Sequence, residues 1–273
     1  MTFHQKIRSI QKNKKSLLCI GLDPDPGKIP PFLRKGASGT QEFAKRIIEA
    51  THDLACAYKL NLAFYEALGS SGWDILRKTL EFLPKNVLSI GDGKRGDIGN
   101  TAAMYARALF RELRFDAVTV NPYMGSDSVA PFLKDPRKGA FVLALTSNAG
   151  ARDFQYLKTG RRPLYEHVIA KVQEWDTLEN CGLVVGATRS GELRRIRALA
   201  PTMPILIPGI GAQGGDLKSA VRFGCTKHGD LAIINVSRSI LYASSGRDFA
   251  DAARREALTL REQMMKYKEA FFS

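Results

Sequence analysis

Short apolar segments rich in β-branched residues alternate along this chain with longer amphipathic segments. Eight of the apolar segments predict strands, at residues 17–23, 57–66, 86–94, 116–123, 140–147, 183–188, 205–211 and 231–239. They are nearly continuous apolar runs, which is typical of strands buried on both faces of a parallel sheet. Helical patterns separate or follow them, at residues 41–55, 72–83, 101–113, 163–175, 191–200, 216–224 and 248–272.

This alternation of strands and helices predicts the α/β class and, more specifically, a (β/α)8 TIM barrel. An open, doubly wound sheet can produce the same alternation, but the count of eight favours a closed barrel. The chain of 273 residues has the size of such a barrel, and 44% of its residues are hydrophobic, enough for a large core. It contains no linker, low-complexity segment or repeat beyond the βα unit, so we expect one domain over residues 1–273.

Polar residues gather where the predicted strands end, which is where TIM-barrel enzymes carry their chemistry. The residues at these ends are Asp23 at the end of strand one, Asp92 and Lys94 at the end of strand three, Ser147 at the end of strand five and Arg238 at the end of strand eight. Lys59 differs, because it lies inside the otherwise apolar second strand. An unpaired ammonium would be costly there, so we expect a carboxylate partner for it.

The segment GDGKRGDIGNT, residues 91–101, holds the densest group of charges near a strand end. Asp92 and Lys94 point to the same side of the strand because strand side chains alternate. Asp97 follows the strand, where it could instead cap the next helix. A structural ion pair in the barrel interior would also explain Lys59. We favour a Lys59–Asp92–Lys94–Asp97 charge array at one site, because the two lysines come from adjacent strands.

A glycine-rich stretch, PGIGAQGGD, runs from Pro208 into a predicted helix after strand seven. Free backbone N–H groups at such a turn suit an anion. Arg238 at the end of strand eight has a planar guanidinium that suits phosphate oxygens. TIM barrels often bind phosphate at these two loops. The stretch could also be a plain turn between strand and helix, but the nearby arginine favours a phosphate site.

These motifs together resemble the orotidine 5′-monophosphate decarboxylase family, and in particular its larger bacterial branch. DGKRGDI resembles the family signature D-x-K-x-x-D. Further similar segments are IGLDPD around Asp23, YKLN around Lys59, TVNPYMG from Thr119, LTSNAGA around Ser147, PGIGAQGGD from Pro208 and SRSI around Arg238. Each segment taken alone is weak evidence for the family. In this order and at this spacing they make the resemblance specific, and it extends over most of the chain.

The resemblance implies decarboxylation of orotidine 5′-monophosphate to uridine 5′-monophosphate, the last step of de novo pyrimidine nucleotide biosynthesis, without cofactor or metal. It makes Lys94 the ammonium that stabilises and protonates the carbanion at C6 of the pyrimidine. It puts Asp92 beside the departing carboxylate. Lys59 and Asp23 would bind the ribose hydroxyls, and Lys59 would also bridge the aspartates. Arg238 would bind the phosphate.

The remaining site residues are also implied by the resemblance. Ser147 would hydrogen-bond the pyrimidine, although a strand-end cap or turn is an alternative role for it. Gln213 would bridge phosphate and pyrimidine, and Pro208 would line an apolar part of the pocket. The resemblance places one segment, with Asp97, Ile98 and Thr101, in the site of a partner subunit. It therefore implies a homodimer with shared active sites.

Two positions depart from the pattern of the family. Ser237 stands where a glycine often precedes the arginine, and it brings a side chain close to the expected phosphate site. Ala149 stands where a proline is common. Both bear on loop conformation and substrate affinity more than on the charge array.

The net charge of +14, from 41 Lys and Arg against 27 Asp and Glu, raises the possibility of nucleic-acid binding. However, the basic residues are spread along the chain without a zinc-finger, RNP or basic-zipper pattern, and this hypothesis gives no reason for a lysine inside strand two. We favour a basic surface that concentrates an anionic substrate and expect no nucleic-acid partner.

Cellular context is predicted by three features. The basic N-terminal segment lacks an apolar core, so no secretory signal is expected. No apolar run approaches the ~20 residues that span a bilayer, so we expect no membrane partner. The four cysteines form no C-x-x-C pair, which favours reduced, partly buried thiols and a cytoplasmic protein.

One other enzyme class shares the barrel and the charged triplet. Magnesium-dependent sugar-phosphate decarboxylases and aldolases belong to the same suprafamily, and there the carboxylates bind the metal. The combination of TSNAGA, AQGGD and SRSI in this chain favours the nucleotide enzyme.

Overall fold

The computed structural model describes residues 1–186, 190–210 and 216–272. Eight parallel strands close into a barrel in the order β1-β10-β9-β8-β5-β4-β3-β2. The strands are β1 (Leu18–Gly21), β2 (Ala57–Asn61), β3 (Leu88–Arg95), β4 (Ala117–Val120), β5 (Gly139–Leu145), β8 (Cys181–Val185), β9 (Ile205–Ile207) and β10 (Ala232–Val236). The predicted (β/α)8 barrel is therefore confirmed.

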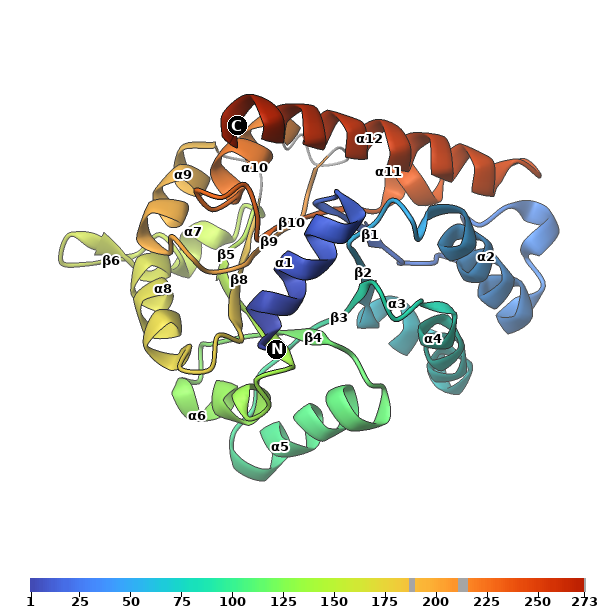
Figure 1. Ribbon diagram of the computed structural model, residues 1–273. Helices are drawn as coiled ribbons and strands as arrows, with labels where there is room; N and C mark the ends of the chain where they lie inside the picture. Colours follow the sequence, from blue (N-terminus) through green and yellow to red (C-terminus); the bar gives the residue numbers. More distant parts are fainter. Residues whose placement is uncertain (187–189, 211–215, 273) are drawn as a thin grey trace.

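A ring of helices surrounds the barrel (Figure 1). Its members are α2 (Gly36–Thr51), α4 (Gly69–Phe82), α5 (Gly99–Arg107), α8 (Leu164–Trp175), α9 (Ser190–Leu199), α10 (Leu217–Gly224) and α12 (Phe249–Phe272). These are the seven predicted helices; the fourth strand is followed only by short turns, α6 (Ser126–Val129) and a 3-10 turn at Ala130–Leu133. A helix was predicted over residues 101–113, but α5 ends at Arg107. The chain continues from there as a π-helical turn at Ala108–Glu112.

The second strand is shorter than predicted. β2 ends at Asn61, and the apolar segment after it forms the short helix α3 (Leu62–Glu66). The Asn61 side chain caps this helix by accepting a 3.3 Å hydrogen bond from the backbone N–H of Ala63. An apolar run of this length does not distinguish a buried strand from a buried helical turn, so the pattern placed the boundary too late.

The eighth strand is also shorter than predicted. β10 ends at Val236, and Arg238 begins the short helix α11 (Arg238–Leu241) instead of ending the strand. Ser237, which lies between them, makes the turn with a φ of −125° and a ψ of −81°. Arg238 therefore lies beyond the carboxyl end of β10.

An N-terminal helix that the pattern did not predict, α1 (Phe3–Lys14), closes one end of the barrel. Thr2 and Gln5 form a capping box at its start. Gln11 donates a 2.7 Å hydrogen bond to the carbonyl of Ala232 and accepts a 2.9 Å bond from the N–H of Leu231. These partners lie at the amino end of β10, and Figure 1 shows α1 lying across the barrel. The carboxyl ends of the strands therefore remain open to ligands.

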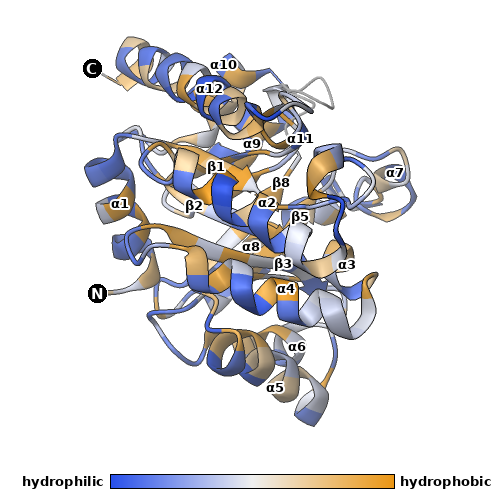
Figure 2. Ribbon diagram, turned by 90° about the vertical axis from the view of Figure 1, so that its right-hand side faces the viewer, coloured by the Kyte–Doolittle hydropathy of each residue, from blue (hydrophilic) through white to orange (hydrophobic). Residues whose placement is uncertain are grey.

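The apolar core has two parts, one inside the barrel and one between strands and helices. Along β2 the side chain of Ala57 lies in the inner cluster and that of Tyr58 in the outer one. Figure 2 shows apolar strands in the middle of the molecule and helices whose polar positions face outward. Alternation then points Lys59 into the barrel, near its open end.

A small antiparallel hairpin, β6 (Lys158–Thr159) and β7 (Arg162–Pro163), lies in the connection from β5 to α8. It protrudes from the ring of helices (Figure 1) and was not predicted, because two-residue strands leave no periodic signal.

All four cysteines are free thiols, and all are buried where partial burial was predicted: Cys19, Cys56, Cys181 and Cys225. Within the described part of the chain, no helix is both long and apolar enough to cross a membrane.

Candidate active site

A cavity of about 430 Å³ opens at the carboxyl ends of the strands. Its lining includes Asp23, Asp25, Lys28, Lys59, Asn61, Phe64, Asp92, Lys94, Pro208, Gly209, Ile210, Asn235, Ser237, Arg238 and Tyr242. A larger hollow of about 730 Å³ lies outside the barrel beside α4, and none of the predicted site residues that the structure describes lines it. The smaller cavity is the candidate site because the predicted charged residues converge there.

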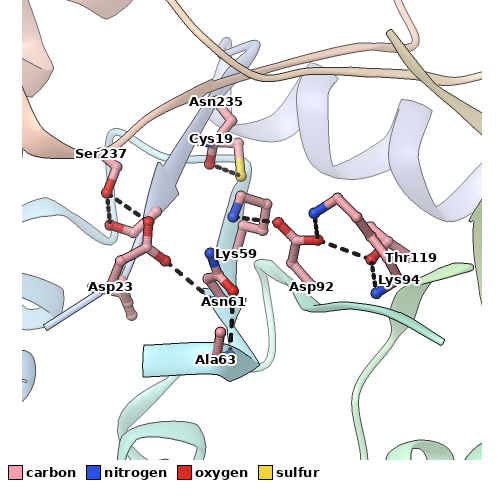
Figure 3. A network of polar contacts seen from close by, with 12 residues as sticks. Cys19, Asp23, Lys59, Asn61, Ala63, Asp92, Lys94, Thr119, Asn235 and Ser237 are labelled. Atoms are coloured by element: carbon pink, nitrogen blue, oxygen red, sulfur yellow. Dashed lines mark hydrogen bonds and ion pairs between the residues drawn. The ribbon is translucent and has the colours of Figure 1, made fainter. Parts of the chain in front are cut away.

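One carboxylate holds two lysines at the floor of this cavity (Figure 3). Nζ of Lys59 lies 2.7 Å from Oδ2 of Asp92, and Nζ of Lys94 lies 2.7 Å from Oδ1 of the same residue. The Lys59 side chain is only 4% exposed, whereas that of Lys94 is 44% exposed. Asp92 thus anchors one buried ammonium and one ammonium that faces the cavity.

The charges of this group stabilise one another. Burial acts to raise the pKa of Asp92, but Lys59 and Lys94 outweigh it and hold that pKa well below its usual range. Burial acts to lower the pKa of Lys59, but Asp23 and Asp92 outweigh it and raise that pKa. At neutral pH the carboxylate and the buried ammonium are therefore both charged inside the protein.

Asp23 follows β1 and is fixed on both of its oxygens. Oδ1 accepts a 3.2 Å hydrogen bond from the backbone N–H of Asn61, and Oδ2 accepts a 2.9 Å bond from the hydroxyl of Ser237. The Ser237 hydroxyl also lies 3.2 Å from the carbonyl of Gly21. The side chain that replaces the usual glycine is therefore directed at Asp23.

The predicted phosphate end is only partly described. Arg238 and Pro208 line the cavity on the side of β9 and β10. Gln213, predicted to bridge phosphate and pyrimidine, lies outside the described residues.

Three predicted residues on the segment after β3 are not among those that line the cavity. Asp97 accepts a 2.8 Å hydrogen bond from the N–H of Ile98, and Ile98 is 53% exposed, with Thr101 exposed on the first turn of α5. The helix starts at Gly99 without a side-chain cap, so Asp97 does not have the alternative capping role. In the single chain, the charge array consists of Lys59, Asp92 and Lys94.

Ser147 also does not line the cavity. It is exposed just after β5 and lies against the backbone of Gly186. Ala149, the second departure, lies in the following turn, where its carbonyl accepts a hydrogen bond from the N–H of Arg152. Its backbone makes this turn without the proline.

The sequence analysis missed six polar residues at the site. Asp25, Lys28 and Tyr242 lie outside the strands, and three others lie on them. Asn61 and Asn235 line the cavity, and Thr119 donates a 2.9 Å hydrogen bond to Oδ1 of Asp92. Each lies at an inward position of its strand, two residues from another inward residue. A search for polar residues at every second position of the apolar strands would have found them.

The arrangement offers one ammonium to a ligand in a partly enclosed cavity, backed by a carboxylate and a second ammonium. An arginine lies elsewhere in the same lining. Such a site can bind an anionic ligand and can stabilise and protonate a developing carbanion. The closed parallel barrel with charged residues at its carboxyl rim defines a (β/α)8-barrel enzyme.

Comparison with known proteins gives the family. Residues 16–253 match the model of the "Orotidine 5'-phosphate decarboxylase / HUMPS family". An orotidine 5′-phosphate decarboxylase of Dehalococcoides mccartyi is 51% identical, over 99% of this chain and 100% of the relative. The chain therefore belongs to this family.

Solved structures agree with this result. The OMP decarboxylase of Leishmania donovani has a TM-score of 0.83 and 41% identity, covering 96% of this chain and all of the other. The UMP synthase of the same organism has a TM-score of 0.84 and 43% identity. That match includes 96% of this chain but only 57% of the synthase.

Proposed function

We propose that this chain decarboxylates orotidine 5′-monophosphate to uridine 5′-monophosphate without a cofactor, as the last step of de novo pyrimidine nucleotide synthesis. The observation that carries the proposal is the Lys94 ammonium, held at 2.7 Å by the buried Asp92 and facing the cavity. Residues 1–273 act as one catalytic domain. The reaction takes place in the cytoplasm, where buried thiols stay reduced.

The reaction breaks the bond between C6 of the pyrimidine and its carboxylate. The electron pair stays on C6, CO2 leaves, and a proton passes from Nζ of Lys94 to C6. A fixed ammonium in a partly enclosed cavity stabilises this developing charge more strongly than water does. Asp92 lies beside the departing carboxylate and holds Lys94 in place.

The rest of the nucleotide is bound by groups around the same cavity. Asp23 and Lys59 bind the ribose hydroxyls, and Arg238 binds the phosphate. Binding energy from this remote phosphate helps to hold the pyrimidine against Lys94. Ser147 hydrogen-bonds the pyrimidine, Gln213 bridges phosphate and pyrimidine, and Pro208 lines the apolar part of the pocket.

The active protein is a homodimer whose subunits complete each other's sites through Asp97, Ile98 and Thr101. Apolar exposure supports this proposal. Ile98, Met104, Tyr123 and Met124 are large hydrophobic residues with exposures of 53%, 56%, 80% and 46%. Ile98 directly precedes α5, Met104 lies on α5, and Tyr123 and Met124 lie in the loop before α6, a helix that contacts α5. A second copy would cover this surface.

The test is to mix the purified protein with orotidine 5′-monophosphate and EDTA and to follow the loss of orotate absorbance. We expect full activity with EDTA, and uridine 5′-monophosphate as the product. Lys94→Ala should nearly abolish turnover while still binding the product nucleotide. Absence of turnover by the unmodified protein would overturn the proposal, and activity lost on chelation would favour the metal-dependent branch.

A further inference from the structure

The ladder between β3 and β4 is interrupted at the candidate site. Gly91 pairs with Val118, but the next pair joins Arg95 to Val120. Residues 92–94 of β3 therefore lie opposite a single residue of β4, Thr119. This is a bulge, which locally disrupts the ladder hydrogen bonds and turns the strand. It holds both Asp92 and Lys94.

Lys94 adopts an unusual backbone conformation within this bulge. Its φ of 45° lies in the left-handed region, which disfavours residues with a side chain. Such a conformation persists only where surrounding contacts enforce it. The ammonium end of Lys94 is bonded to Asp92, so the backbone needs a partner of its own.

The Thr119 hydroxyl supplies that partner. Oγ1 accepts a 2.9 Å hydrogen bond from the backbone N–H of Lys94 and donates a 2.9 Å bond to Oδ1 of Asp92. The same Oδ1 accepts the 2.7 Å bond from Nζ of Lys94. Figure 3 shows Thr119 beside both residues, and only 1% of Thr119 is exposed. One hydroxyl thus replaces the missing ladder contact and connects the backbone of Lys94 to the carboxylate that holds its side chain.

We propose that Thr119 is a positioning residue that holds Lys94 and Asp92 in reactive geometry. This inference rests on the proposed function, because it assigns a role in that reaction. A hydroxyl can accept from an N–H and donate to a carboxylate through the same oxygen atom. Valine has nearly the same shape but does neither. Serine keeps both bonds and loses one methyl group.

The expected effect lies in turnover more than in binding. A displacement of about 1 Å at a reacting group can cost on the order of 100-fold in rate. For Thr119→Val we expect kcat to fall by about 10- to 100-fold while KM changes by less than about threefold. Thr119→Ser should stay within about threefold of the unmodified protein in both.

The experiment measures kcat and KM for orotidine 5′-monophosphate in the unmodified protein, Thr119→Val, Thr119→Ser and Thr119→Ala. Thr79→Val is the matched control, since Thr79 is also buried and its hydroxyl donates to the carbonyl of Ile75 in α4, away from the cavity lining. It should leave kcat unchanged. Thr119→Ala tests the same loss of hydroxyl without a branched side chain, in case the valine variant does not fold.

Slow turnover of the folded valine or alanine variant, with rescue by serine, would support the role. Unchanged kcat without the hydroxyl, or a serine variant as slow as the others, would overturn it and leave the proposed function intact. If the unmodified protein itself shows no turnover, the proposed function fails first and this inference falls with it.

Discussion

The Ser237 hydroxyl donates a 2.9 Å hydrogen bond to Oδ2 of Asp23, across the mouth of the barrel from β10 to β1. This bond orients a carboxylate that we propose binds ribose. A hydrogen bond from a neutral donor to a charged group contributes about 1.5–3 kcal/mol. Ser237→Ala should therefore raise KM by about 10-fold, with a smaller change in kcat. Steady-state kinetics would measure this.

Ser244→Ala is the matched control for this change, since Ser244 makes a similar 2.7 Å bond to Asp248 away from the cavity lining. It should leave KM unchanged. Equal KM values for the two variants would show that Asp23 needs no support from Ser237.

Arg238→Ala should mainly weaken binding of the phosphorylated substrate. Loss of charge-assisted hydrogen bonds to phosphate corresponds to about a 10- to 100-fold rise in KM. The preference for the nucleotide over orotidine, which lacks the phosphate, should shrink by the same factor. The exposed Arg161 in the β6–β7 turn provides a charge-matched control. A preference for the nucleotide that survives in Arg238→Ala would contradict the phosphate assignment.

Shared active sites predict that two inactive variants restore each other. Lys94→Ala and Asp97→Ala should each be nearly inactive alone. After subunit exchange, half of the dimers are mixed and carry one intact site of two, so activity should recover to about a quarter of the unmodified value. Activity of the mixture would be measured against each variant alone. No recovery, despite exchange shown by mass spectrometry, would exclude sites completed by Asp97 of a second copy.

Asp92 also affects stability. Asp92→Ala leaves the buried Lys59 without its bonded partner, so we expect the free energy of unfolding to fall by about 3–5 kcal/mol. Asp74→Ala removes an exposed pair with Arg77 and should cost less than about 1 kcal/mol. Denaturant titrations would measure both values. Similar losses in the two variants would contradict the importance of burial.

The same pair predicts a pH dependence. The pKa of Asp92 is lowered by folding. Its contribution to the free energy of unfolding is therefore present above the unfolded pKa of about 3.9 and is lost as pH falls through the folded pKa. The pKa of Lys59 is raised by folding. Its contribution to the free energy of unfolding is therefore present below the unfolded pKa of about 10.4 and is lost as pH rises through the folded pKa. The stability difference between the unmodified protein and Asp92→Ala should be flat between these limits. A difference that grows on acidification would contradict this.

The closed end of the barrel gives a prediction on packing. A Cβ added to Gly139 would lie 2.1 Å from a ring carbon of Phe3 in α1. Gly139→Ala should therefore displace α1 and cost about 1–3 kcal/mol or more in unfolding free energy. Among the described residues, none lies within 4 Å of a Cβ added to Gly191 in α9, so Gly191→Ala should be neutral or stabilising by up to about 1 kcal/mol. Thermal or denaturant unfolding of both variants would decide; equal stabilities would show that α1 does not pack tightly here.

The sequence was sufficient for the barrel and for the central charges. Continuous apolar runs alternating with helical patterns indicate a buried parallel sheet, because local periodicity and burial follow directly from residue order. Lys59 required a carboxylate partner because an isolated ammonium inside a strand is too costly. Its adjacency to Asp92 followed from the order of strands two and three, and the structure confirms it at 2.7 Å.

Tertiary structure decided what depends on contacts between distant segments. The covering of the barrel by α1 and the role of Thr119 opposite a bulge could not be deduced from periodicity. The direction of Ser237 toward Asp23 is likewise set by the closure of β10 against β1. Residues far apart in the chain meet only when the sheet closes, and the register of that closure fixes which side chains touch. Local patterns specify elements, whereas packing specifies the hydrogen bonds between them.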